Sequence, residues 1–253
     1  MKLSGNTILV TGGGTGIGRA LAESFHALGN KVVIAGRRQA PLDATIAANP
    51  GMASLTLDIG DAESIRAFAR TAIEKHPDLN VVLHNAGIMQ PENLIAPDFD
   101  LTTAEATIAT NLLGPIRLTA ALLPHLRQRP KAAIITVSSG LAFVPLAITP
   151  TYCATKAAIH SYSQSLRYQL RGTPVEVIEI APPYVQTELM GPQQASDPNA
   201  MPLNDFIAET MTLLAGSPEP SEICVERVKP LRYAERDGGY EGVFGFLNSA
   251  FAH

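Results

Sequence analysis

The feature that most constrains this 253-residue chain is an alternation of short β-branched apolar runs with longer stretches of helical period. A strand followed by a helix, repeated along a chain, is typical of parallel βαβ units. The runs consist almost entirely of Val, Ile, Leu, Thr and Ala, as expected when helices cover both faces of a sheet. We therefore predict an α/β fold with a doubly wound, Rossmann-type parallel sheet of about six strands. The predicted strands span residues 7–11, 31–35, 53–57, 81–83, 133–137 and 175–180.

The same pattern predicts the helices and the domain organisation. Helical period covers residues 17–28, 40–48, 62–74, 99–126 and 152–170, with a break near Gly114-Pro115. Residues 188–205, rich in Pro, Gln and Met, predict a mobile loop at the substrate site. From about residue 219 to residue 253 helical spacing returns, so we expect a helical C-terminal extension rather than a final strand. All of these elements belong to one predicted domain, residues 1–253.

Composition excludes several classes of protein. The chain has 46% hydrophobic and 17% charged residues, which is too apolar for disorder. Its formal net charge of −4 supplies no basic field for nucleic acid. The longest apolar runs, such as residues 131–137, fall short of the roughly 20 residues of a membrane span, and the first residues do not resemble a secretory signal. We expect no nucleic-acid or membrane partner and a cytoplasmic location.

Cysteine and histidine usage gives no support to a metal site. Cys153 and Cys224 are too few for a disulfide framework or a four-thiolate zinc site. The six histidines include no pair at the i,i+4 spacing that places two ligands on one helix face. The sequence therefore predicts reduced thiols and no bound metal.

A glycine-rich turn joins the first predicted strand to the first helix. Gly12, Gly16 and Gly18 would allow a tight turn, a close backbone approach to a pyrophosphate and close helix–strand packing. The helix N-terminus would face the phosphates with free N–H groups. A merely flexible turn is the alternative, but the flanking strand and helix favour dinucleotide binding. The expected cofactor contacts here are Gly12, Thr15, Gly16, Ile17 and Gly18.

The end of the second strand bears on the choice between NAD and NADP. An acid there would bind the adenosine ribose hydroxyl of NAD, whereas an arginine would accept the 2′-phosphate of NADP. The chain has Gly36 at that position, followed by Arg37 and Arg38, whose guanidinium groups can bind phosphate oxygens. The alternative is that both arginines belong to an exposed helix start. We predict NADP(H) in preference to NAD(H).

A tyrosine and a lysine four residues apart form a candidate acid pair. Tyr152 and Lys156 would lie on one face near the start of a helix. A cation beside a phenol stabilises the phenolate, which would make Tyr152 a general acid at neutral pH. Because such a pair is weak evidence alone, its context matters. Ser139 directly follows the fifth predicted strand, and the carboxyl ends of strands line the ligand crevice of such sheets.

Together these motifs resemble the short-chain dehydrogenase/reductase family over about three quarters of the chain, through Thr187. The opening residues and the helical ending, where family members commonly have a seventh strand, further resemble the DltE-like branch. The matching motifs are Thr11-Gly12-x-x-x-Gly16-x-Gly18, Asn85-Ala86-Gly87, Asn111, Ser139 and Tyr152-x-x-x-Lys156.

The resemblance implies a role for each matching residue. Tyr152 would transfer the proton to or from the substrate oxygen, Ser139 would hydrogen-bond that oxygen, and Lys156 would tune Tyr152 and hold the nicotinamide ribose. Asn111 would fix a water in a proton relay, although it could merely cap or kink its helix. Further cofactor contacts would come from Asp58, Ile59, Asn85, Ala86, Gly87, Tyr152, Lys156, Val185 and Thr187, and of these Asp58 could instead begin the next helix.

The predicted function is an NAD(P)-dependent oxidoreductase that acts on CH–OH or C=O groups. Residues 141–146, Tyr184 and the 188–205 loop should border an apolar pocket for a small to medium aldehyde, ketone or secondary alcohol. The family resemblance also implies a homodimer through helices near residues 111–126 and 152–170. The alternative function is a dinucleotide-binding sensor without turnover. A hydrolase or a kinase is excluded because the chain lacks a Gly-x-Ser-x-Gly elbow around Ser139 and the Gly-Lys-Ser/Thr ending of a P-loop.

Overall fold

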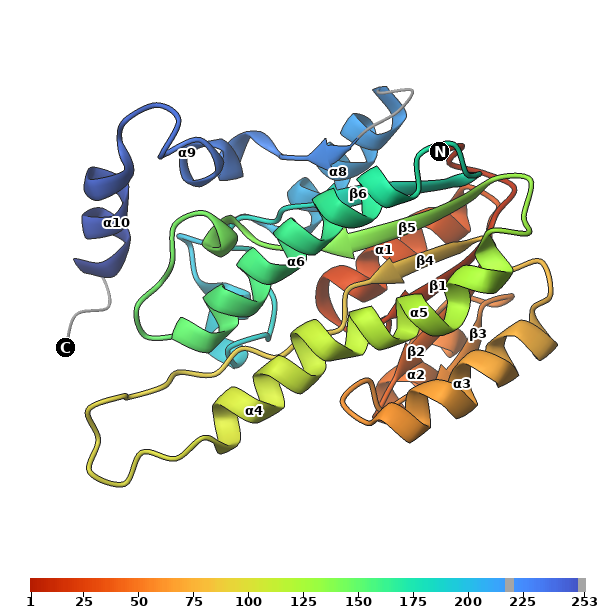
Figure 1. Cartoon of the computed structure of the whole chain (residues 1–253), viewed down its shortest axis with the longest axis horizontal. Helices are drawn as coiled ribbons and strands as arrows, with labels where there is room; N and C mark the ends of the chain where they lie inside the picture. Colours follow the sequence, from red (N-terminus) through yellow and green to blue (C-terminus); the bar gives the residue numbers. More distant parts are fainter. Residues whose placement is uncertain (217–220, 250–253) are drawn as a thin grey trace.

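The computed structural model describes residues 1–216 and 221–249. In this part of the chain a sheet of seven strands has the order β3-β2-β1-β4-β5-β6-β7, with every neighbouring pair parallel. The chain winds outward from β1 in both directions, so the predicted doubly wound, Rossmann-type sheet is confirmed (Figure 1). The strands are β1 (Thr7–Thr11), β2 (Lys31–Gly36), β3 (Ala53–Thr56), β4 (Val81–His84), β5 (Ala132–Val137), β6 (Val175–Ile180) and β7 (Glu222–Ile223).

Helices cover both faces of this sheet. One layer contains α1 (Gly16–Ala27), α2 (Gln39–Ala48) and α8 (Leu203–Gly216), and the other contains α3 (Ala62–Lys75), α5 (Gly114–Leu126) and α6 (Pro150–Gln169). Successive strand residues point to opposite faces. Ile8 and Val10 of β1 therefore pack with α1 and α8, whereas Leu9 packs with α3 and α5. This double burial explains why the strands are almost purely apolar.

One long helix runs from Thr102 to Leu126 through α4 (Thr102–Ile108), the π-helical turn η1 (Ala109–Leu113) and α5. The sequence predicts a break near Gly114-Pro115; in the structure the helix continues, and the π turn ends where Gly114 begins α5. By length and composition these 25 residues could cross a membrane, although they contain no uninterrupted apolar run of that length. In the fold they belong to the helical layer, because α5 packs on α3 and α4 packs on α6.

The chain after β6 differs in part from the expectation. Within residues 188–205 the structure has the short helix α7 (Pro192–Ser196) and the first turn of α8. Glu222 and Ile223 then form β7, which pairs with Glu179 and Ile180 of β6 and adds a seventh strand to the predicted six. Two residues are too few to show a strand period, and the apolar residues that follow have helical spacing, so the sequence did not reveal this strand.

The predicted helical ending is confirmed by α10 (Tyr240–Ser249), which follows η3 (Glu226–Val228) and α9 (Lys229–Arg232). Asn248 of α10 attaches this helix to the loop before α6. Its side-chain oxygen accepts from the Ala147 N–H at 2.6 Å, and its amide nitrogen donates to the Pro145 carbonyl oxygen at 3.1 Å. The remainder of the predicted extension, residues 219–220 and 250–253, lies outside the described residues.

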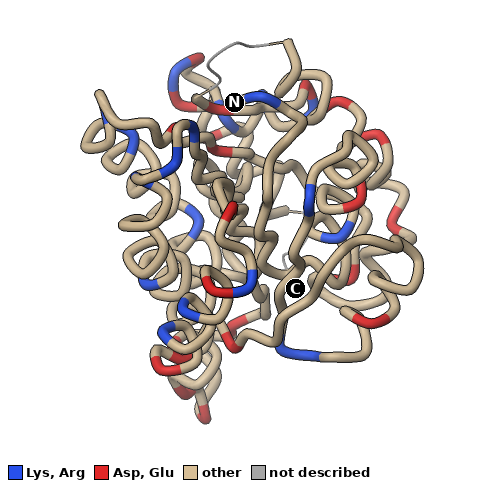
Figure 2. Tube along the Cα trace, turned by 90° about the vertical axis from the view of Figure 1, so that its right-hand side faces the viewer, with Lys and Arg blue, Asp and Glu red and all other residues tan. Residues whose placement is uncertain are grey.

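Charged residues are mixed along the chain. Figure 2 shows Lys and Arg positions interspersed with Asp and Glu positions around the trace, which fits the small formal net charge of −4. Ion pairs within the described residues include Arg19 with Glu23 and Arg232 with Glu222.

Candidate active site

The glycine-rich turn lies at the carboxyl end of β1 and is held by Asn85, which follows β4. Gly12 and Gly16 adopt φ angles of +67° and +53°, a region that favours glycine. The Asn85 amide donates to the Thr11 carbonyl oxygen at 3.2 Å, and a Cβ on Gly18 would overlap both this amide and the Gly12 carbonyl oxygen. The turn therefore requires glycine at 12, 16 and 18 for its own geometry, besides any approach of a ligand.

The start of α1 has the properties of an anion site. Thr15 is the N-cap residue, and its side chain makes no capping hydrogen bond to the helix. The first N–H groups of a helix lack intrahelical partners and carry the positive end of its dipole. They are thus available to a phosphate placed over the turn. Ile17, one residue into the helix, packs partly against the core beneath the sheet.

A cleft opens beside this turn, over the carboxyl ends of β1, β2 and β4. Seven of the predicted cofactor contacts line it: Gly12, Thr15, Arg37, Arg38, Ile59, Ala86 and Gly87. The other lining residues were not predicted as cofactor contacts, although Thr11 belongs to the glycine-rich motif and Gly36 marks the position that bears on the choice of cofactor. These residues are Thr11, Gly14, Ala35, Gly36, Pro41, Leu42, Leu57, Ile88 and Thr110. Most of them lie at the end of a predicted strand or just after it, so the position of the strand ends in the sequence could have identified them as cleft residues.

The 2′-phosphate expectation concerns the β2 end of the cleft. Gly36 leaves this end open, since a Cβ there would meet only Leu42, at 3.7 Å. Arg37 and Arg38 are both exposed, and in the described part of the chain neither forms an ion pair with a carboxylate. Two guanidinium groups are thus available at the position where an acid would select NAD.

Nine predicted contacts are outside the cleft's lining: Gly16, Ile17, Gly18, Asp58, Asn85, Tyr152, Lys156, Val185 and Thr187. Asp58, Thr187 and Val185 are three of these nine. Asp58 is exposed, and its carboxylate accepts from the Gly60 N–H at 2.9 Å, which is a turn at the end of β3 rather than a helix start. Thr187 lies against the glycine turn, where a Cβ on Gly16 would be 3.5 Å from its methyl group. Val185 is buried and pairs with Met201 in an isolated parallel bridge.

Tyr152, Lys156 and Ser139 meet at the carboxyl end of β5. The Lys156 ammonium nitrogen lies 5.5 Å from the centre of the Tyr152 ring and donates to the Val137 carbonyl oxygen at 2.8 Å. Burial raises the pKa of the Tyr152 phenol, and the adjacent Ser139 hydroxyl opposes this rise. Burial lowers the pKa of Lys156 to about 8, while the negative charge of Glu179 acts in the opposite direction. Burial thus outweighs the stabilisation of the phenolate that the neighbouring cation was expected to give, and the site brings a phenol, a second hydroxyl and a cation to one point.

Asn111 is hydrogen-bonded to α6, the helix that carries Tyr152 and Lys156. It lies in the π turn η1 and is buried, and its side-chain amide nitrogen donates to the Ile88 carbonyl oxygen at 2.8 Å and to the Thr155 hydroxyl at 3.3 Å. Its side-chain oxygen accepts from the Ile88 N–H at 2.9 Å. π turns frequently occur at functional sites. Asn111 therefore connects the loop after β4 to α6 at Thr155, between Tyr152 and Lys156. Its side chain does not merely cap its own helix.

Apolar side chains surround the Tyr152 ring. Met89, Leu146 and Cys153 are buried with it, and a partly buried shell packs around this group: Leu141, Ile148, Met190 and Leu247. Leu141, Leu146 and Met190 come from segments predicted to border the substrate. Met89, Ile148 and Leu247 were missed; Leu247 belongs to α10, and nothing in the sequence near the motifs points to it.

Four other residues from the segments predicted to line the pocket are not part of the apolar group around Tyr152. Val144 is fully buried, and the Phe143 ring packs edge-on against His160 at 4.8 Å between ring centres. The Tyr184 hydroxyl donates to the Asp197 carboxylate at 3.0 Å. Leu189 is exposed.

Comparisons with known proteins agree with this geometry. Residues 6–198 match the family model described as short chain dehydrogenase. The chain is 41% identical over 252 residues to an uncharacterized oxidoreductase, DltE, of Bacillus subtilis (strain 168), which covers 98% of this chain and 99% of the relative. A short chain dehydrogenase from Burkholderia cenocepacia J2315 in complex with NADP has a similar fold, with a TM-score of 0.81, 23% identity and coverage of 98% and 99%. A short chain dehydrogenase/reductase from Burkholderia phymatum in complex with NAD has a TM-score of 0.82, 20% identity and coverage of 95% and 96%.

Proposed function

Because the chain belongs to the short-chain dehydrogenase/reductase family and is an NAD(P)-dependent oxidoreductase of small molecules, we propose that it is an NADP-preferring carbonyl reductase or alcohol dehydrogenase. Its substrate is a small to medium apolar aldehyde, ketone or secondary alcohol. The observation that carries this proposal is the Lys156 ammonium 5.5 Å from the Tyr152 ring, beside Ser139. The comparisons give no support to a silent dinucleotide sensor.

In this proposal Tyr152 is the general acid of carbonyl reduction. Its hydroxyl gives a proton to the carbonyl oxygen as that oxygen gains negative charge, and Ser139 donates a hydrogen bond to the same oxygen. Lys156 stabilises the phenolate that remains. Asn111 holds the Ile88 backbone and Thr155 in place and orders a water that returns a proton to Tyr152. In the direction of alcohol oxidation each proton moves the opposite way.

The cofactor proposal rests on the residues of the cleft. Gly12, Gly16 and Gly18 give the turn a shape that a Cβ would fill, and the uncapped start of α1 supplies N–H donors for a pyrophosphate. Thr15, Ile17, Asp58 and Ile59 contact the adenosine half, and Asn85, Ala86, Gly87, Val185, Thr187, Tyr152 and Lys156 contact the nicotinamide half. When bound, the nicotinamide supplies or accepts the hydride. Arg37 and Arg38 favour NADP(H), because paired guanidinium groups bind a phosphate well and Gly36 places no carboxylate against it.

The substrate proposal rests on the apolar ring of side chains around Tyr152. Met89, Leu146 and Met190 belong to one apolar cluster with Tyr152. No Lys or Arg occurs between Arg171 and Arg227, so an anionic substrate would lack a partner in this region. We propose that residues 188–205 form a mobile border of this pocket within a single domain spanning 1–253.

We also propose that the protein is a cytoplasmic homodimer. The dimer would form through the helices near 111–126 and 152–170. Leu113, near the start of the first of these helices, is an exposed apolar side chain of the kind that such an interface would cover. Light scattering at micromolar concentration is expected to give twice the mass of the chain, and a tetramer would count against the proposal.

The test of the activity is oxidation of NADPH and NADH with a panel of apolar aldehydes and ketones. Wild type is expected to turn over with NADPH at a higher kcat/KM than with NADH. Tyr152→Phe removes only the hydroxyl, so turnover should fall by at least about a hundredfold while NADPH binding changes little. Binding is followed by the fluorescence of NADPH in both proteins.

The controls separate chemistry from folding. Tyr168→Phe removes a phenol from the exposed end of the same helix and should leave kcat unchanged. Undiminished turnover in Tyr152→Phe would refute the assigned acid. Tight NADPH binding by wild type without turnover on any carbonyl of the panel would refute the proposed substrate class.

A further inference from the structure

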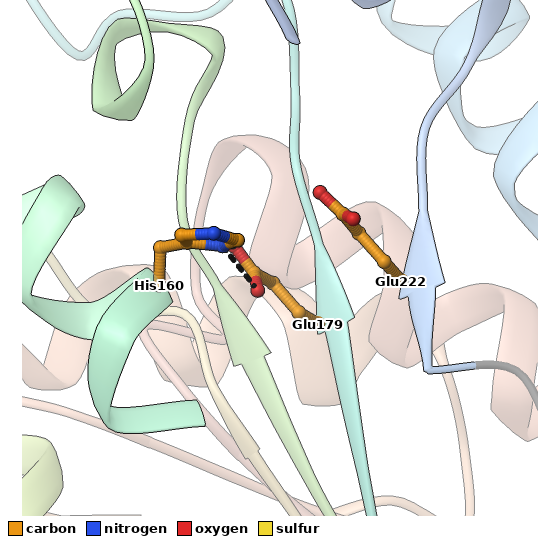
Figure 3. A group of neighbouring side chains, drawn as sticks. All are labelled: His160, Glu179 and Glu222. Carbon is orange, nitrogen blue, oxygen red and sulfur yellow. Dashed lines mark hydrogen bonds and ion pairs between the residues drawn. The ribbon is translucent and has the colours of Figure 1, made fainter. Parts of the chain in front are cut away.

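A cluster of titratable side chains begins one helical turn after Lys156 along α6. Figure 3 shows His160 of α6, Glu179 of β6 and Glu222 of β7 converging over the edge of the sheet. Glu179 is only 1% exposed, and the His160 Nδ1 atom is 3.0 and 2.9 Å from its two carboxylate oxygens. A buried carboxylate is costly unless it is paired, so a compensating cation is expected nearby.

His160 holds the Glu179 carboxylate in place. Its Nδ1 atom lies within hydrogen-bond distance of both carboxylate oxygens, and a carboxylate only accepts, so Nδ1 is the donor. The other ring nitrogen, Nε2, lies 3.0 Å from the side-chain amide of Gln164.

Glu222 is already paired. Both of its oxygens accept from Arg232, with Nε at 2.5 Å and Nη2 at 3.1 Å. His160, Glu179 and Glu222 each offer a possible metal ligand within 4.8 Å of the others. However, the Arg232 guanidinium occupies the carboxylate oxygens that a metal would need. The cluster is therefore built around side-chain cations rather than a metal ion.

The geometry of the helix and sheet places Lys156 as the cation for Glu179. Lys156 and His160 are one turn apart on the same face of α6, and each reaches a neighbouring strand: Lys156 the Val137 carbonyl of β5, and His160 the Glu179 carboxylate of β6. Thr136 and Glu179 are register partners, and the Thr136 hydroxyl contacts Ser163 of α6 at 2.8 Å, so both side chains face this helix. The Lys156 ammonium and the Glu179 carboxylate are thus offset by about one helical turn along α6 and by one strand spacing across the sheet. Taken at right angles, these two offsets give a separation of about 7 Å.

We propose that Glu179 is a positioning residue: a buried counter-charge, held by His160, that keeps Lys156 in its ammonium form next to Tyr152. This inference rests on the role proposed above for Lys156. Without the carboxylate, burial would favour the neutral amine, and the Tyr152 phenolate would lose the cation that stabilises it.

The other titratable and charged groups near the pair are few in the described structure. Tyr152 faces Lys156 from its own helix. Around Glu179 the groups are His160 and Arg167 on α6, Glu222 on β7, Cys224 just after β7 and Arg232 on α9. The Arg167 guanidinium donates to the Ser221 carbonyl oxygen, which also accepts from the Glu179 N–H. Burial and Glu222 raise the pKa of Cys224 to about 12, so this thiol carries no charge near neutral pH. Glu179 is therefore the carboxylate that acts on Lys156.

The experiment measures the ionisation of Lys156 directly. The chain has only six lysines, so its lysine Cε carbons give a simple NMR spectrum with 13C-labelled lysine, and Lys156→Met identifies the signal of interest. A unit charge about 7 Å away in an effective dielectric near 20 corresponds to roughly one to two pH units. In Glu179→Gln the titration midpoint of the Lys156 amine should therefore move to lower pH by roughly one to two pH units.

The matched control is Glu222→Gln, which makes the same charge change in the same cluster but at the carboxylate paired with Arg232. It should leave the Lys156 midpoint unchanged. Glu179→Asp keeps the charge but draws it back toward β6, so its midpoint should lie between those of wild type and Glu179→Gln. If Glu179→Gln does not fold, the comparison of Glu179→Asp with wild type remains decisive.

The two proposals fail in different ways. An unchanged Lys156 midpoint in folded Glu179→Gln, or in Glu179→Asp where only that variant folds, would overturn the counter-charge. If the midpoint moves and the alkaline limb of the kcat profile moves with it, both proposals are supported. If the midpoint moves while the kcat profile does not, Glu179 still controls Lys156 but Lys156 has no role in catalysis.

Discussion

Gly114, the first residue of α5, is a position where helix propensity and tertiary packing predict opposite effects of one substitution. Replacing a glycine inside a helix by alanine normally stabilises it by about 1 kcal/mol, because alanine loses less backbone entropy. At this position, however, a Cβ would lie 2.6 Å from the Ile59 carbonyl oxygen and 2.7 Å from the Ile59 side chain. The neighbour that must yield is the backbone that lines the cofactor cleft.

The packing effect should exceed the propensity effect. Ordinary contacts of a Cβ begin near 3.4 Å, so Gly114→Ala requires a shift of several tenths of an ångström between α5 and the end of β3. Overpacking of this kind costs about 1–3 kcal/mol, and a backbone neighbour favours the upper end. After subtraction of the propensity gain, the expected destabilisation is about 2 kcal/mol. For a chain of this size that corresponds to a decrease in Tm of roughly 4–8 °C.

Thermal unfolding followed by circular dichroism measures this effect, and Gly245→Ala is the matched control. Gly245 lies inside α10, where a Cβ would meet nothing within 4 Å, so its replacement should leave Tm unchanged or raise it. NADPH binding should weaken in Gly114→Ala alone, because Ile59 lines the cleft. A Gly114→Ala protein as stable as wild type would refute the claim that contact with Ile59 requires this glycine.

Three further outcomes are expected. Arg37→Ala should weaken NADPH binding more than NADH binding. Gly36→Asp, for which the structure has room at the Cβ, should weaken NADPH binding further relative to NADH, because it places a carboxylate against the 2′-phosphate. Equal losses of affinity for both cofactors would contradict the assignment. Because burial lowers the pKa of Lys156 to about 8, reduction should decline as the pH rises through that value, and a flat kcat profile to pH 10 would oppose a required ammonium. Burial lowers the pKa of His84 to about 4, so from pH 6.5 downward the unfolded chain binds a proton that the folded chain does not, and stability is lost as the pH falls. Urea unfolding at pH 7.5 and pH 5.0 should show that wild type loses about 2 kcal/mol more than His84→Gln, and identical losses would disprove the burial of a neutral imidazole.

The sequence by itself determined the parallel sheet, because the evidence for it is local. The strands β1, β2, β4, β5 and β6 are mostly buried on both faces and therefore read as short apolar runs, and the helices between them show their own period. The glycine turn after β1 is local as well: Gly12, Gly16 and Gly18 are needed by the backbone of one turn. The spacing of Tyr152 and Lys156 was enough to place both on one helix face, since four residues make about one turn.

Tertiary structure alone decided the features that depend on partners distant in the chain. The strand β7 exists only through its pairing with Glu179 and Ile180, because two residues carry no period of their own. Leu247 reaches the Tyr152 pocket because Asn248 anchors α10 to the loop before α6, which no local pattern encodes. Likewise Glu179 occupies an ordinary strand position in the sequence, and only the packing of α6 on β6 brings it to His160, one helical turn from Lys156. Local periodicity is set by neighbours in the chain, whereas the pairing of buried charges and the lining of a pocket are set by neighbours in space.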